Sequence, residues 1–413
     1  MLKRIVIENY RSCLRTSIDL HPNLSVLIGP NGSGKTNILQ SIMLLSQVAR
    51  QPEHARGMRG ITTKSRMKAM FEWAHSSTEL NASMDAYTNE FNHDILVDSR
   101  QKWLFKKKNE REFISGLPLA IYHQFHPHLS QTNILTDELI RFRHFWSVKH
   151  RATEVMPKWA QRDLGRVARY WSGIRYYGAS QFTNPGSCPT SFEIEREGNL
   201  RGPHRMSGHA KFLYGMYSAK RANSNRNYDD FMEIVGPKGL SLIDDLTFRE
   251  VKSSSTEYSV RVGGKVERRR RENLLVIPQF KIGRQTLSPN QLSEGTFKTL
   301  ALLFHIITED STALLIEEPE VCVHQGLLSS ILELVKSYSN HKQMIMSTHS
   351  DYVLDHVRPD NVYRVGLQKA HGTIARPIRK TMTSKEFAAL RDYLERDGNL
   401  GEYWREGGLG DRP

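Results

Sequence analysis

A glycine-rich segment near the N-terminus constrains the fold of this chain more than any other feature. The segment reads Gly29-Pro30-Asn31-Gly32-Ser33-Gly34-Lys35-Thr36. The run Leu24–Ile28 before it is typical of a buried strand, and residues 37–48 after it carry apolar side chains at helical spacing. Such glycines let backbone N–H groups converge on phosphate oxygens, and the start of the following helix adds the positive end of its dipole. The sequence therefore predicts a strand, a phosphate-binding loop (P-loop) and a helix.

The P-loop also predicts which ligands are bound. A Gly-x4-Gly-Lys-Thr pattern is typical of sites for the β- and γ-phosphates of ATP. Lys35 is expected to neutralise phosphate charge, and Thr36 is expected to hold Mg²⁺. The residues expected to contact ATP here are Gly29, Pro30, Asn31, Gly32, Ser33, Gly34, Lys35, Thr36 and Asn37. ATP and Mg²⁺ are thus the predicted cofactors.

A P-loop needs an acidic partner for its metal ion, and one apolar run supplies it. Residues 313–316 are Ala-Leu-Leu-Ile, followed directly by Glu317, Glu318 and Pro319. At the carboxyl edge of a parallel sheet, Glu317 would face Mg²⁺ and Glu318 would face the attacking water. Glu318 is therefore the candidate general base. The alternative is that these are ordinary solvated glutamates at a strand end, which would leave the P-loop without its metal partner.

Two further segments follow the same order along the chain. An apolar helical pattern over residues 297–307 follows the segment Leu292-Ser293-Glu294-Gly295-Thr296, so Ser293 and Gly295 mark the start of a helix. The free N–H groups of a helix start can bind an anion, or Ser293 can simply be an N-cap. Met344–Ser350 is typical of a buried strand that ends in polar residues. His349 at its end is a candidate partner for the γ-phosphate, although a single histidine is more often structural.

The P-loop, the Leu-Ser-x-Gly segment, the paired acids and the strand-end histidine, in this order, resemble the ATP-binding-cassette (ABC) class of ATPases. Within that class the chain resembles the branch that contains SMC proteins, RecF and the OLD (overcoming lysogenization defect) ATPases. The OLD-like group is the most similar in three segments. These are Ile7–Ser12, the P-loop with Asn37, and Glu317–Glu320 with His324 after it.

The resemblance implies a composite site, in which ATP on the P-loop of one subunit is closed by Ser293 and Gly295 of another. A homodimer or a higher homo-oligomer is therefore expected. The resemblance also adds Arg11 and Gln181 to the residues expected at the nucleotide. Three positions depart from the family pattern: Glu317 stands where many relatives have Asp, Glu294 where Gly is common, and Gln325 where Pro is usual. A longer carboxylate at 317 implies slow turnover.

The expected fold class is α/β, an ABC-type P-loop ATPase core with a mixed sheet and a large, mainly helical insertion. The core is expected to comprise residues 1–50 and 285–380. Residues 51–172 are expected to form the helical insertion, with helices over Thr136–His150 and Trp159–Trp171. Residues 173–284 are expected to be a strand-rich return to the core, and residues 381–413 a C-terminal helix with a glycine-rich tail.

Composition narrows the functional classes. Lys and Arg number 58 against 44 Asp and Glu, which leaves a net charge of +14 and favours a polyanion such as DNA as a partner, although many soluble proteins are merely basic. No apolar run is long enough to cross a bilayer, so no membrane partner is expected. The N-terminus has a charged strand pattern rather than that of a signal peptide, so a cytoplasmic location is expected.

Two functional hypotheses follow. The first is a sensor or regulator ATPase of an antiphage defence system, in which ATP-dependent dimerisation acts as a switch and controls a separate effector, a nuclease or toxin. The alternative is a DNA-binding ATPase similar to RecF and SMC proteins, acting in repair or recombination. The long insertion disfavours a third possibility, the motor of a membrane transporter.

Overall fold

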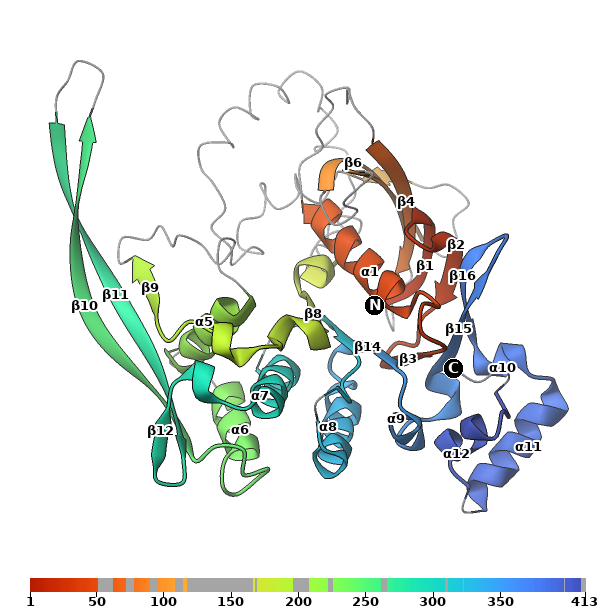
Figure 1. The fold of residues 1–413 in the computed structure, drawn as a ribbon. Coiled ribbons are helices and arrows are strands. Elements are labelled where there is room, and N and C mark those ends of the chain that lie inside the picture. Colours follow the sequence, from red (N-terminus) through yellow and green to blue (C-terminus); the bar gives the residue numbers. More distant parts are fainter. Residues whose placement is uncertain are drawn as a thin grey trace, which may run out of the picture. The chain divides into compact units, whose positions relative to one another are not determined.

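The structure is a computed structural model of the 413-residue chain. It describes residues 1–50, 62–71, 78–89, 96–107, 114–116, 166–167, 169–195, 208–221, 226–260, 266–308, 311–321, 323–396 and 398–409. These residues form two compact units (Figure 1). The first unit comprises Met1–Tyr176, Ser311–Glu317 and Ser339–Pro413, and the second comprises Tyr177–Asp310 and Glu318–Tyr338. Each unit is described by itself.

A mixed sheet carries the P-loop in the first unit. Its strand order is β16-β15-β3-β14-β13-β8. The bounds are β3 Leu24–Ile28, β8 Ile174–Gly178, β13 Ala313–Glu317, β14 Gln343–Thr348, β15 Val362–Gln368 and β16 Gly372–Pro377. β3 lies parallel to β14 and β15, β13 lies parallel to β14, and β16 is antiparallel to β15. Both β3 and β14 are buried along their whole length, which explains their nearly continuous apolar sequences. The predicted mixed sheet is confirmed.

An antiparallel sheet completes the first unit, with strand order β2-β1-β4-β5-β6-β7. The bounds are β1 Leu2–Tyr10, β2 Cys13–Asp19, β4 Thr62–Phe71, β5 Thr78–Asn89, β6 Leu96–Lys107 and β7 Ile114–Gly116. The helix α1, Lys35–Arg50, lies against this sheet (Figure 1). Ile38 and Ile42 of α1 join Ile5 and Ile7 of β1 in one buried core.

The expectation of a mainly helical insertion over residues 51–172 is wrong for the part that the structure describes. β4 pairs with β1 over six residue pairs, from Leu2↔Phe71 to Glu8↔Arg66, and extends the sheet through β5, β6 and β7. Buried Met67, Ala69 and Phe71 alternate with exposed Arg66 and Lys68 and the half-buried Met70, which is the period of two of a half-buried strand. The predicted helix over 136–150 lies outside the described residues.

The end of this segment does contain a helical turn, at residues 166–167 and 169–172. Trp171 in this turn is fully buried, and its ring centroid lies 5.2 Å from that of Phe71. Its carbonyl oxygen accepts a hydrogen bond from Ser46 Oγ of α1 at 2.7 Å. Segments from both ends of the supposed insertion therefore belong to the core of the first unit.

The second unit combines helices with a long two-stranded ribbon. Its helices are α5 Gly208–Arg221, α6 Arg226–Val235, α7 Glu294–Ile307 and α8 Gln325–Tyr338. They enclose an aromatic core in which Phe212 contacts Phe297 and Phe304 edge to face, at centroid distances of 5.4 and 5.7 Å. The ribbon pairs β10, Asp245–Val260, with β11, Val266–Ile282, along their whole length (Figure 1). β9, Phe192–Glu195, and β12, Gln285–Leu287, also pair with β11.

Residues 173–284 therefore contain strands, as expected from sequence, but also the helices α5 and α6. The C-terminal region contains α10 Ile378–Thr381, α11 Ser384–Glu395 and α12 Leu400–Arg405. α12 lies where a glycine-rich tail was expected. Asn399 caps it by accepting a hydrogen bond from the Glu402 N–H at 2.7 Å, and Leu400 and Trp404 are buried one turn apart. Within the described ranges, no helix has the length and apolar character required to span a bilayer.

Candidate nucleotide-binding site

Three parallel strands end together at one edge of the mixed sheet. Glu317 of β13 is in register with Ser347 of β14, and Ser347 is in register with Leu27 of β3. The P-loop follows β3 directly, and His349 follows β14. Ligands of parallel α/β sheets bind at the carboxyl ends of the strands. The topology therefore brings the P-loop, Glu317 and His349 to the edge where a ligand is expected.

The loop conformation needs glycine at two positions. Gly34 has a φ of +101°, and a Cβ there would lie 2.0 Å from Thr373 Oγ1. A Cβ on Gly29 would lie 2.0 Å from the carbonyl oxygen of Val365. Both contacts are far too short for any side chain to fit. The backbone of the loop is thus packed closely on β15 and β16.

Lys35 opens α1 and lies inside the loop. Its Nζ donates hydrogen bonds to the carbonyl oxygens of Gly29 at 2.8 Å and Pro30 at 3.2 Å, and the residue is 4% exposed. The neighbouring Ser33 is also buried, and its Oγ has no hydrogen-bond partner within the described part of the chain. A buried hydroxyl without a partner is unfavourable. A phosphate oxygen would satisfy it, so the loop fits the predicted triphosphate.

A relay of hydrogen-bonded side chains supports the backbone of the P-loop. Asn37 Nδ2 donates to Ser12 Oγ at 2.6 Å, and Thr373 Oγ1 donates to the Ser33 carbonyl at 2.9 Å. Ser12 Oγ and Thr373 Oγ1 lie 2.7 Å apart. Because the single hydroxyl hydrogen of Thr373 is used on Ser33, Ser12 must be the donor of that central bond. The relay therefore runs from Asn37 through Ser12 and Thr373 to the P-loop backbone.

Arg11 lies in the turn between β1 and β2, with a left-handed φ of +49°. Its NH1 contacts Asn37 Oδ1 at 3.4 Å and donates a hydrogen bond to Gln40 Oε1. Its guanidinium carbon lies 5.5 Å from the ring centroid of Tyr10. The structure thus places Arg11 over the first turn of α1. Its predicted contact with nucleotide stays a prediction.

The residues expected to hold Mg²⁺ contact each other. Thr36 Oγ1 donates a hydrogen bond to Glu317 Oε1, and Tyr176 OH donates one to Glu317 Oε2. Burial raises the pKa of Tyr176, and the bond to Glu317 and its charge raise it further, so the phenol remains a donor at neutral pH. A threonine hydroxyl and a carboxylate oxygen are hard oxygen ligands of the kind Mg²⁺ prefers, so this pair fits the ion.

Glu318 has a left-handed backbone, with a φ of +46°. Its carbonyl oxygen accepts a hydrogen bond from the Val321 N–H at 3.1 Å, which closes a turn directly after β13. A non-glycine residue in this conformation costs about 1 kcal/mol or more, and such residues cluster at functional sites. The unusual backbone turns the chain away from the course of β13 directly after Glu317.

The remaining predicted nucleotide contacts lie in the second unit. Ser293 is the exposed N-cap of α7, and its Oγ accepts a hydrogen bond from the Thr296 N–H at 3.2 Å. Glu294, where the family pattern has glycine, pairs with the buried Lys298 at 2.8 Å. Gln181 is exposed on a short 3-10 helix, Ala179–Phe182. The structure does not place these residues or Gly295 against the P-loop, so their nucleotide roles remain predictions.

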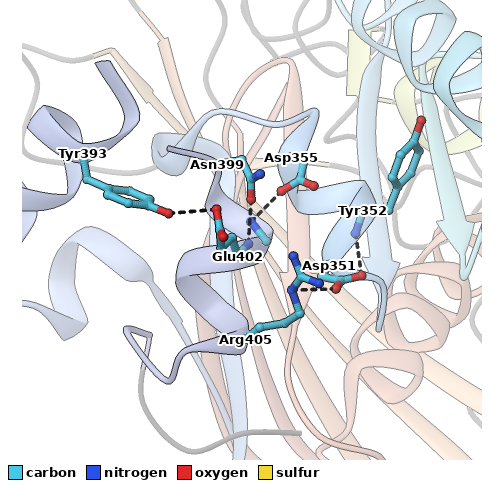
Figure 2. A network of polar contacts seen from close by, with 8 residues as sticks. Asp351, Tyr352, Asp355, Tyr393, Asn399, Glu402 and Arg405 are labelled. Carbon is cyan, nitrogen blue, oxygen red and sulfur yellow. Dashed lines mark hydrogen bonds and ion pairs between the residues drawn. The ribbon is translucent and has the colours of Figure 1, made fainter. Parts of the chain in front are cut away.

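His349 is half-buried and is followed at once by the helix α9, Asp351–Asp355. Figure 2 shows α12 packed against α9. The Gly401 N–H donates to Asp355 Oδ1 at 2.8 Å, and Arg405 Nε pairs with Asp351 Oδ2 at 3.1 Å (Figure 2). A Cβ on Gly401 would lie 2.2 Å from the Asp351 carbonyl oxygen, so the two helices are in close contact. The C-terminal region thus holds the segment that follows His349.

Sequence reasoning gave no role to Ser12, Tyr176 or Thr373. Ser12 lies in Ile7–Ser12, which resembles the family, and Tyr176 begins Tyr176–Gln181, a looser echo of it, so the resemblance was the available signal for both. No local pattern marked Thr373.

A P-loop between β3 and α1, with paired acids at the end of β13, a parallel strand of the same sheet, defines an ABC-type P-loop ATPase core. The chain matches the family described as RecF/RecN/SMC N terminal domain over residues 1–373. It therefore belongs to that family.

Sequence similarity to two individual relatives spans short segments. The chain is 28% identical over 126 residues to the DNA replication and repair protein RecF of Lactococcus lactis subsp. cremoris, covering 28% of this chain and 35% of that protein. It is 48% identical over 44 residues to the DNA double-strand break repair Rad50 ATPase of Methanopyrus kandleri, covering 11% of this chain and 5% of that protein. The matches thus span about a third or less of these relatives. Among solved structures, the SMC head domain from Thermotoga maritima is 14% identical in sequence, with a TM-score of 0.41. The match covers 91% of this chain and 98% of that one.

Proposed function

We propose that this protein binds ATP with Mg²⁺ and hydrolyses it slowly, with a second copy completing the site. The observation that carries the proposal is the contact between Thr36 and Glu317 beside a glycine-shaped P-loop that encloses Lys35. In this proposal residues 29–37 hold the triphosphate, and Thr36 and Glu317 hold the ion. Mg²⁺ would neutralise charge on the phosphates.

The hydrolytic roles fall to residues around the strand ends. Glu318 is proposed as the general base for the attacking water, and its left-handed backbone supports a special role. His349 is proposed to contact the γ-phosphate from the end of β14. Arg11 and Gln181 are proposed to add contacts at the nucleotide.

Dimerisation is proposed to be the switch. Ser293 and Gly295 of a second copy would face the phosphates with the N-terminus of α7, where exposed backbone N–H groups attract anions. ATP would then join two copies, and hydrolysis would release them. Light scattering should show dimers with ATP and monomers with ADP.

Two variants test the composite site. Lys35→Ala is expected to lose nucleotide binding and therefore dimers. Ser293→Arg is expected to keep nucleotide binding and to lose dimers, because the bulky cation blocks the helix start in the partner. Gln285→Arg, at an exposed position in the same unit, controls for the added charge. ATP-dependent dimers that persist in Ser293→Arg would contradict the proposal.

DNA is the partner that the comparisons favour. The two relatives described above are a DNA replication and repair protein and a DNA double-strand break repair ATPase. The net charge of +14 suits a polyanion, and the run Arg268–Arg271 lies within β11. Filter binding of duplex DNA should depend on ATP and weaken with salt. Absence of binding at low salt would remove this partner.

A second candidate is the regulation of a separate effector, a nuclease or toxin, in antiphage defence, as the OLD-like motifs predict. The observation that favours it is the C-terminal region beyond Thr373, outside the family match, whose α12 packs on the helix after His349. An effector bound there could sense the nucleotide state. Co-purification of the candidate effector, lost on replacing residues 398–409 by a flexible linker, would support it. Unchanged capture would contradict it.

A further inference from the structure

Glu317 uses both oxygens of its carboxylate on side-chain hydroxyls from two different elements. Thr36 at the start of α1 bonds Oε1, and Tyr176 of β8 bonds Oε2. β8 is the neighbour of β13 in the sheet, so Tyr176 approaches from the adjacent strand. With both oxygens bonded, the carboxylate cannot rotate about its last bond without breaking a contact.

This restraint matters because position 317 holds Glu rather than the shorter Asp. Glu has one more rotatable bond, and fixing a long polar side chain costs rotamer entropy. A glutamate held only at one oxygen would lose that freedom when it binds an ion. Tyr176 has only two side-chain torsions and packs against the buried core of the first unit. Its contact fixes Glu317 before any ligand arrives.

The two oxygens of Glu317 are therefore not equivalent. Oε1 faces Thr36, the other expected ligand of Mg²⁺, whereas Oε2 faces the phenol. Mg²⁺ requires nearly ideal geometry and tolerates displaced ligands poorly, and groups that orient a ligand affect metal affinity by about 10–100-fold. We propose that Tyr176 is a positioning residue, which holds Glu317 so that Oε1 is presented to Mg²⁺ beside Thr36. This inference rests on the proposed function.

The test is the dependence of nucleotide binding on Mg²⁺. A fluorescent ATP analogue is titrated into the full chain at a series of MgCl₂ concentrations, and separately in EDTA. Tyr176→Phe is expected to raise the half-saturating Mg²⁺ concentration about tenfold or more. Its affinity for the nucleotide in EDTA should equal that of the wild type, because Tyr176 acts on the ion and not on the phosphates.

Tyr170→Phe is the matched control. Tyr170 is buried in the same unit, and its hydroxyl donates to Gln343 at 2.6 Å, so the change also removes one tyrosine hydroxyl bond. Its Mg²⁺ dependence should be that of the wild type. Thermal melts of both variants establish that they fold.

A double-mutant cycle separates positioning from general damage. Asp at position 317 has one rotatable bond fewer than Glu, so it gains less from the restraint by Tyr176. Adding Tyr176→Phe to the Glu317→Asp variant should therefore change the half-saturating Mg²⁺ concentration less than about threefold. An equal loss in both backgrounds would overturn the inference, as would a wild-type Mg²⁺ requirement in Tyr176→Phe. If the wild type itself shows no Mg²⁺-dependent nucleotide binding, the proposed function fails and the inference falls with it. If only the Tyr176→Phe effect is missing, the proposed function stands.

Discussion

Thr373 offers the sharpest test of how the P-loop is held. It is fully buried, and its hydroxyl donates to the Ser33 carbonyl at 2.9 Å while accepting from Ser12. Thr373→Val keeps the shape of the side chain but removes this hydroxyl. The Ser33 carbonyl then lacks its donor and Ser12 lacks its acceptor. A buried polar group left unpaired costs about 1–3 kcal/mol.

Thr373→Ser makes the opposite change, because it keeps the hydroxyl and removes a methyl group. A buried methyl contributes about 0.8 kcal/mol, so this variant should also lose stability. The two variants should differ at the ligand. If Thr373→Val makes the binding conformation of the P-loop less stable by about 1–2 kcal/mol, ATP affinity drops about 5–30-fold. Thr373→Ser should bind ATP like the wild type.

Calorimetric ATP titration with unfolding curves for both variants provides the assay. Stability should fall in both, and affinity only in Thr373→Val. Equal ATP affinities in the two variants would refute the idea that the relay holds the P-loop in its binding conformation.

Three further changes test other parts of the chain. Glu318→Gln should keep ATP affinity, lower hydrolysis by about 100-fold or more and accumulate dimers in light scattering; wild-type turnover would exclude Glu318 as the base. Gly401→Val would bring a side chain against the Asp351 carbonyl, so hydrogen exchange of residues 349–356 should increase, and unchanged exchange would contradict the packing of α12 on α9. Burial raises the pKa of Asp355 above its ordinary value of 3.8, and the charge of Asp351 raises it further. Because the folded state holds this proton more tightly than the unfolded state, the folded state loses stability as the pH rises from 3.8 through the raised pKa. Asp355→Asn, which keeps an acceptor for Gly401, should therefore raise the melting temperature at neutral pH and lose this advantage near pH 3.8, whereas a pH-independent gain would point to another cause.

The sequence predicted those parts of the fold that carry their signal locally. Leu24–Ile28, the P-loop and α1 follow one another within a single strand-loop-helix unit, and the apolar runs of β13 and β14 are long enough to identify as buried strands. Residues 51–172 are basic and rich in aromatics, and the helix-like stretches Thr136–His150 and Trp159–Trp171 favour a helical insertion there. The alternation of exposed Lys64, Arg66 and Lys68 with buried Ser65, Met67 and Ala69 is the period of two that marks a strand.

The supporting contacts of the site could not be predicted in the same way. Thr373 meets Ser33 across 340 positions of sequence, and Tyr176 meets Glu317 across 141. Such contacts depend on the order of strands in the sheet, which places β16 under the loop and β8 beside β13. No spacing rule within one element contains that information.

Two departures from the family pattern acquire partners in the folded chain. Glu317 is bonded by Tyr176 and Thr36, so its extra length is held rather than left mobile. Glu294 pairs with Lys298 one turn along α7. The Lys298 side chain is only 1% exposed, and a buried ammonium requires a compensating charge. An acidic residue in the first turn also suits the positive end of the helix dipole. Each glutamate is thus explained by a contact within its own unit.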